Sequence, residues 1–115
     1  MIKINSKVFF IITLITSLIF ALAGLSKIIG MQMMHDSFVT LGLPIWFGYF
    51  IGICEVFGSI GIQIRKLRFY ACFGLTIIML GAINYHLQYE NDGLLASIII
   101  TALCLLLLIS RDREN

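Results

Sequence analysis

The chain has 115 residues, of which 60% are hydrophobic and only 12% are charged, and its formal net charge at pH 7 is +2. A composition this apolar is typical of an integral membrane protein and leaves little chain for a soluble domain. The small positive charge does not indicate nucleic-acid binding, because the basic residues form short clusters beside apolar runs without interleaved aromatic side chains.

Four apolar runs, residues 8–26, 44–64, 69–87 and 94–110, are each long enough to cross about 30 Å of hydrocarbon as a helix rising about 1.5 Å per residue. Because lipid offers the backbone no hydrogen-bond partners, each run must satisfy its amides within a helix. We therefore predict an all-α fold, an integral membrane four-helix bundle that forms a single transmembrane domain over the whole chain.

Basic residues predict the orientation of these spans. If the four helices alternate in direction, Lys27 is the one basic residue that falls on the opposite side from all the others. Such an asymmetry in short loops is the positive-inside pattern, so we expect both termini to be cytoplasmic. The residues on the predicted cytoplasmic side are Lys3, Lys7, Arg65, Lys66, Arg68, Arg111 and Arg113.

The first loop, residues 28–43, is the only connection with room for structure of its own. Apolar side chains, several of them methionines, mix there with polar ones. This mixture predicts a short helix that lies at the membrane interface or caps the bundle, ended by Gly42 and by Pro44. His35, within that segment, is expected to face solvent.

Small and polar residues recur at helical spacing in every run, and residues three or four positions apart share one face of a helix. We expect these faces to point into the bundle, because small residues let membrane helices approach closely. The four stripes are Thr13, Ser17, Gly24 and Lys27; Gly48, Gly52, Glu55, Ser59 and Gln63; Tyr70, Gly74, Gly81 and Asn84; and Ser97, Thr101 and Cys104.

Glu55 is the most informative residue, because it lies near the middle of the second run. An ionised carboxylate at that depth costs about 3 kcal/mol on insertion scales, so it is expected to be paired, neutral or functional. In one interpretation Glu55 is a neutral acid that is hydrogen-bonded to Ser17 or Thr101 and gives the bundle specificity. In the other, Glu55 handles a proton or contacts a ligand.

Lys27, Asn84 and His86 are expected to form a second polar layer nearer the outer face. Lys27 has two interpretations: it extends to the lipid head groups, or it folds inward and pairs directly with Glu55. An outward-opening pocket between the two layers would connect them without contact. His86 is expected to lie at the interface.

Neither a metal centre nor dithiol chemistry is predicted. The acidic residues of the third connection, Glu90 and Asp92, lack the ligand spacing of a calcium loop and are expected to be solvated. Cys54, Cys72 and Cys104 lie in apolar runs and form no Cys-x-x-Cys motif, so they are interpreted as packing residues.

Several short motifs follow one another in a characteristic order. Gly24-Leu25-Ser26-Lys27 ends the first run, Leu41-Gly42-Leu43-Pro44 opens the second, and Gly52-Ile53-Cys54-Glu55-Val56-Phe57-Gly58 lies within it. In the third run Met79-Leu80-Gly81-Ala82 precedes His86-Leu87. Through these motifs the chain resembles the DoxX-like family of small four-helix membrane proteins, over nearly its whole length.

This resemblance implies that Lys27, Glu55 and His86 are the polar positions of interest. It also implies a scattered range of functions: one branch resembles the membrane subunit of archaeal thiosulfate:quinone oxidoreductase, other members are linked to redox-stress complexes, and a related animal group assists receptor assembly.

Three functions follow as hypotheses. The first is a redox-associated membrane subunit that binds a quinone-like or other lipid-soluble molecule, with Lys27 or His86 bonding a carbonyl and Glu55 relaying a proton. The second is a non-enzymatic factor that assembles or stabilises partner membrane proteins through residues 31–43. The third is proton-coupled export of small molecules by a homodimer, although small multidrug transporters carry their essential carboxylate in the first span. In each case we expect a multi-pass protein of a bacterial inner membrane, and whether it is an enzyme stays open.

Overall fold

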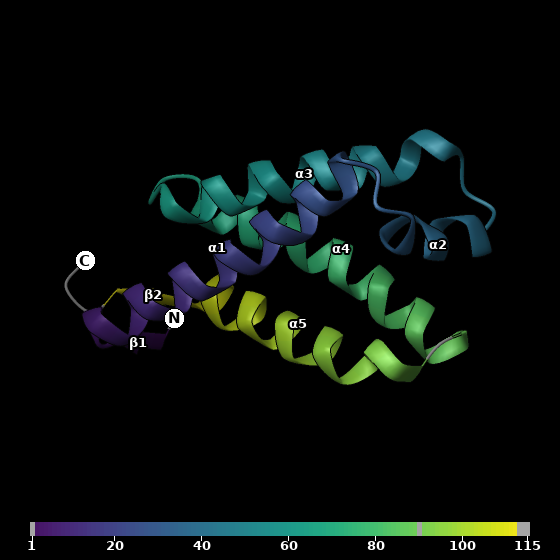
Figure 1. Ribbon diagram of the computed structural model, residues 1–115. Helices are drawn as coiled ribbons and strands as arrows, with labels where there is room; N and C mark the ends of the chain where they lie inside the picture. The colour runs from purple at the N-terminus through teal and green to yellow at the C-terminus, as the bar shows by residue number, and fades with distance from the viewer. Residues whose placement is uncertain (1, 90, 113–115) are drawn as a thin grey trace.

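The computed structural model describes residues 2–89 and 91–112. The predictions for Glu90 and Arg113, and for the side chain of Arg111, therefore lie outside the described part. The elements, in chain order, are β1 (Ile2–Ile4), α1 (Ser6–Ile28), α2 (Gln32–Thr40), α3 (Ile45–Gln63), α4 (Arg68–Gln88), the 3-10 turn η1 (Asn91–Gly93), α5 (Leu94–Ile109) and β2 (Ser110–Asp112), as Figure 1 shows.

Four helices have the length and composition of membrane spans: α1, α3, α4, and α5 together with the preceding turn η1. The boundaries of α1, α3, α4 and α5 lie within two residues of the predicted runs, and the short helix predicted in the first loop is present as α2. The principal extents are 45 × 25 × 18 Å, and the longest of these is close to the roughly 40–45 Å of a bilayer with its head groups. The predicted all-α membrane bundle is confirmed.

Different segments of the chain lie at the two ends of the bundle (Figure 1). The start of α1, the α3–α4 connection and the end of α5 lie at one end, and α2 and η1 lie at the other, here called the α2 end. β1 pairs in parallel with β2, with Ile2 opposite Ser110 and Ile4 opposite Asp112. This pairing was not predicted, because three-residue strands carry too little periodicity to be recognised. The basic segments at 3–7 and 65–68 thus share one end, which is the arrangement that the predicted orientation requires.

Glycines allow α1 and α3 to pack with their backbones in contact. A Cβ atom at Gly24 would lie 2.6 Å from the carbonyl oxygen of Gly52, and one at Gly52 would lie 2.7 Å from the Cβ of Lys27. Any side chain at either position would therefore separate the helices. The stripes predicted to face inward in these two spans are buried at Thr13, Ser17, Gly24, Gly48, Gly52, Glu55 and Ser59.

The inward face predicted for the third span is wrong. Tyr70 is 72% exposed, Asn84 is exposed, and a Cβ at Gly74 or Gly81 would meet nothing within 4 Å. The face that α4 buries carries larger residues instead, namely Cys72, Leu75, Thr76 and Met79.

The physical reason for this reversal lies on α3. A Cβ at Gly58 would lie 2.8 Å from Leu75 Cδ2, and one at Gly61 would lie 2.9 Å from the Cβ of Ala71. Glycines of α3 thus receive the side chains of Leu75 and Ala71, so α4 does not need glycines of its own at the contact. Only one of two facing helices has to be small for close packing, and the spacing within a single helix does not reveal which one is.

Candidate functional site

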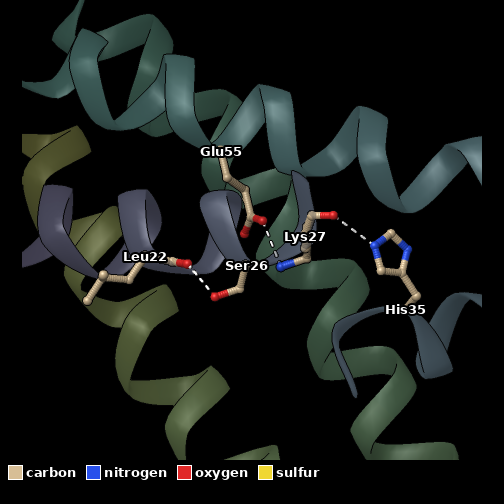
Figure 2. A network of polar contacts seen from close by, with 5 residues as sticks. All are labelled: Leu22, Ser26, Lys27, His35 and Glu55. Carbon is tan, nitrogen blue, oxygen red and sulfur yellow. Dashed lines mark hydrogen bonds and ion pairs between the residues drawn. The ribbon is translucent and has the colours of Figure 1, made fainter. Parts of the chain in front are cut away.

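A buried ion pair joins α1 to α3. Lys27 Nζ lies 2.7 Å from Glu55 Oε1, and the two side chains are only 12% and 4% exposed, as Figure 2 shows. Of the two interpretations of Lys27, extension to the head groups is therefore wrong, and the inward fold onto Glu55 is what the structure contains.

The geometry of antiparallel helices explains why these two residues meet. Ser17 of α1 lies beside Ser59 of α3, whereas Gly24 lies beside Gly52, so positions that ascend α1 descend α3. Side chains on a helix tilt toward its own N-terminus. Lys27 therefore points away from the α2 end and Glu55 points toward it. The two side chains thus extend toward each other along the helix axes, and their charges meet.

Both members of the ion pair can still bond a further group. Among the described residues, Glu55 Oε1 has no aligned hydrogen-bond partner, although it lies within contact distance of Lys27 Nζ. At 2.7 Å the two groups form an ion pair, because attraction between two charges depends little on the angle. Glu55 Oε1 can therefore still accept a hydrogen bond or a proton, and the Lys27 ammonium, with three N–H donors, can bond a further acceptor.

Ser17 and Thr101 make their hydrogen bonds to groups other than the Glu55 carboxyl. Ser17 Oγ donates to the carbonyl oxygen of Ser59 at 3.0 Å and accepts from Gln63 Nε2 at 2.7 Å. Thr101 Oγ1 donates to the carbonyl oxygen of Ser97 at 2.7 Å, within its own helix. The interpretation of Glu55 as an acid hydrogen-bonded to one of these hydroxyls is wrong, because Lys27 is the polar group against its carboxyl.

His35 of α2 connects the ion pair to the first loop. Its Nε2 lies 2.9 Å from the carbonyl oxygen of Lys27, its ring packs over Gly48, and the centroid of that ring is 4.5 Å from the ring of Tyr49. His35 is half-buried, so the expectation that it faces solvent is wrong. Gly48 was the available signal, since a glycine at the start of a span can hold a ring from a neighbouring segment.

A cavity of about 200 Å³ lies between α2 and the start of α3. The expected pocket was to open between Glu55 and the layer of Lys27 and His86, but none of these three residues lines this cavity. His35 contributes to the cavity wall and also bonds Lys27, so it separates the two features. The lining residues are Gly30, Gln32, His35, Phe38, Val39, Leu43, Pro44, Ile45 and Tyr49.

The remaining two candidates lie on the last turns of α4. Asn84 is exposed and its Oδ1 accepts a hydrogen bond from Gln88 Nε2 at 2.8 Å. The His86 ring packs against Gly93 of η1 and lies 5.4 Å from the ring of Tyr85, measured between centroids. The structure thus brings Lys27 and Glu55 together, whereas Asn84 and His86 belong to the α4–η1 corner.

Within residues 2–89 and 91–112, no group of three or more His, Cys, Asp or Glu side chains could hold a metal ion. Cys72 and Cys104 are buried in the core, and Cys54 is half-buried, in agreement with their interpretation as packing residues.

Comparisons with known proteins gave one finding. A model described as the DoxX-like family matches residues 11–110, a segment that contains Lys27, Glu55, His86 and all of α2. Neither the curated proteins nor the solved structures gave a match.

Proposed function

The chain belongs to the DoxX-like family, and from this premise we propose that it is a redox-associated membrane subunit that binds a quinone-like or other lipid-soluble molecule. The observation that carries the proposal is the Lys27–Glu55 ion pair, which is buried within helices apolar enough to span a membrane. Ionisable residues at such depth are costly and are typical of proton paths and ligand sites.

The chemistry of the pair suits a molecule with a carbonyl oxygen. Lys27 keeps the Glu55 carboxyl in place as the acid that serves this oxygen. Reduction of a quinone consumes two electrons and two protons; Glu55 relays one proton that it takes from water, and water supplies the second. The electrons come from a partner redox protein.

The test compares Glu55→Gln, which keeps the size of the side chain and removes its charge, with Asp36→Asn on the exposed face of α2 as a matched control. We expect the purified wild-type protein to retain quinone in a solvent extract, and Glu55→Gln membranes to lose at least tenfold in the quinol turnover that depends on this protein. Asp36→Asn should leave both measurements unchanged. A protein that retains no quinone, together with turnover indifferent to Glu55→Gln, would end the proposal.

A second candidate function is supported by the surface of α2. None of its residues is buried, and two of its apolar side chains are largely exposed, Met33 by 76% and Val39 by 69%. A factor that assembles or stabilises membrane partners would use this surface. A photo-crosslinker at position 33 should then capture a specific membrane or redox protein, and capture of copies of this chain alone would favour a homodimer and count against the idea.

The same proposal places this multi-pass protein in a bacterial inner membrane, as one domain with both termini cytoplasmic. Reporter fusions after residue 112 and within residues 31–43 test this orientation. We expect the first to report the cytoplasm and the second the outer side, and the opposite result would reverse the topology.

A further inference from the structure

We infer that the cavity between α2 and α3 binds the head group of an uncharged amphipathic molecule that carries a flat ring. This inference rests on the proposed function and deepens it, because it assigns a place and a head-group chemistry to the lipid-soluble molecule. The site differs from the one expected from the sequence, since the cavity is built by His35, Tyr49 and the apolar residues around them rather than by Lys27 or His86.

The size of the cavity fits one ring. Its volume is about 200 Å³, whereas an engineered apolar cavity of about 150 Å³ is enough to hold benzene. A six-membered ring with small substituents therefore fits, and a sugar-bearing or otherwise bulky head group does not.

The lining selects for a neutral head group. No Lys, Arg, Asp or Glu is among the described residues that line the cavity, so a phosphate or an ammonium group would be buried there without a counter-charge. Gln32, His35 and Tyr49 supply the polar groups, and these can bond carbonyl or hydroxyl oxygens. The rings of His35 and Tyr49, 4.5 Å apart, offer aromatic surface to a flat molecule.

The edge of the cavity suits an alkyl tail. Ile45, which lines it at the start of α3, is 85% exposed, and Val39, which lines it from α2, is 69% exposed. Both side chains are apolar and exposed, so a tail attached to the bound ring leaves the cavity over apolar surface. The occupant is thus an amphipathic lipid-soluble molecule rather than a water-soluble metabolite.

The position of α2 couples this cavity to the ion pair. Gly30 and Gly42 flank α2 with φ of 83° and 76°, a conformation that glycine adopts without strain. His35 is the link, because it lines the cavity and bonds the Lys27 carbonyl at 2.9 Å. A ring that displaces His35 therefore acts directly on the residue that holds Glu55.

The experiment uses Trp46, the only tryptophan of the chain, which follows Ile45 of the cavity wall. The full-length protein in lipid nanodiscs is titrated with decylubiquinone while Trp46 fluorescence is recorded. We expect saturable quenching. Val39→Phe, which enlarges a side chain at the edge of the cavity, should weaken the apparent affinity at least fivefold, and Met33→Phe, which places the same aromatic side chain on α2 away from the lining, should leave it unchanged. Circular dichroism of both variants checks that they fold.

Three results overturn the assignment: quenching that only rises linearly with quinone partitioned into lipid, saturable quenching that Val39→Phe does not weaken, or displacement by hexadecylphosphocholine as effective as displacement by menadione. The last would show that a charged head group is accepted. Saturable quenching that is insensitive to Val39→Phe but lost in Glu55→Gln would reject the cavity as the binding site and would still support the proposed function. Quenching that Val39→Phe weakens, together with quinol turnover that Glu55→Gln does not change, would support the cavity as the binding site and reject the proposed function.

Discussion

The helices of the α1–α3 pair and those of the α4–α5 pair pack against each other by different means. Between α1 and α3 the backbones touch at Gly24 and Gly52, and polar side chains bond across the interface: Lys27 to Glu55, Ser17 to the carbonyl oxygen of Ser59, and Gln63 to the carbonyl oxygen of Thr13 at 3.1 Å. On α4 and α5, Thr76 and Thr101 donate to carbonyl oxygens of their own helices. Their buried surface is otherwise made by Leu75, Met79, Cys104 and Leu107.

The two helix pairs therefore differ in role: α4 and α5 are held by packing, whereas α1 and α3 also carry the candidate site. Lipid tails are as apolar as leucine, so membrane helices associate through close packing and interhelical hydrogen bonds rather than through the hydrophobic effect. The α4–α5 half relies on side-chain packing, and the buried hydroxyls of Thr76 and Thr101 bond within their own helices. The α1–α3 half concentrates polar groups, and both the ion pair and the adjoining cavity depend on it.

The largest expected effect comes from breaking the ion pair on one side. Lys27→Met should reduce the free energy of unfolding by about 3–5 kcal/mol, because Glu55 is left buried without its counter-charge. The Lys27→Met, Glu55→Leu double variant should be more stable than Lys27→Met alone. Both are measured by reversible unfolding in mixed micelles. A double variant that is no more stable than the single one would show that the pair is not coupled.

The second prediction contrasts glycines of the two halves. Gly24→Ala should destabilise by about 1–3 kcal/mol, because the new Cβ meets backbone atoms of Gly52 and Val56 that cannot yield. Gly81→Ala is the control: its Cβ meets nothing, and replacing a helical glycine should stabilise by up to about 1 kcal/mol. Equal effects in the same unfolding assay would contradict the close contact of α1 with α3.

A smaller contrast concerns buried hydroxyls. Ser17→Ala removes the hydrogen bond from Ser17 to the carbonyl oxygen of Ser59 and the hydroxyl that accepts from Gln63. We therefore expect a loss of about 0.6–2 kcal/mol, the range of hydrogen bonds between membrane helices. Thr101→Val removes only a bond within α5 and should cost less than Ser17→Ala. If Thr101→Val proved the more costly of the two, the assignment of cross-helix bonding to the α1–α3 half would be wrong.

The smallest effect is local. His35→Phe keeps a ring over Gly48 but cannot bond the Lys27 carbonyl, so α2 should loosen while the bundle keeps its stability. Hydrogen exchange followed by mass spectrometry should show faster exchange in residues 32–40, with the same unfolding midpoint as wild type. Unchanged exchange there would mean that packing alone holds α2.

Much of the candidate site followed from residue type alone. Glu55 and Lys27 stood out because ionisable side chains are rare and costly within apolar runs. Their direct contact did not follow, since counting residues along each helix placed them in different layers and ignored the opposite tilts of side chains on antiparallel helices. His35 and the cavity were missed because they depend on how α2 folds back over Gly48.

Hydropathy along the chain was sufficient to determine the number of spans, their limits and the helical fold, because a segment in lipid has to satisfy its own backbone amides and a helix is how a single segment does so. The tertiary structure decided which face of each helix is buried. Gly58 and Gly61 of α3 accept side chains of α4 and turn its glycines outward, while Gly24 and Gly52 bring α1 close enough to α3 for Lys27 to reach Glu55. Burial of a helix face is a property of the two surfaces in contact, and one surface alone does not specify it.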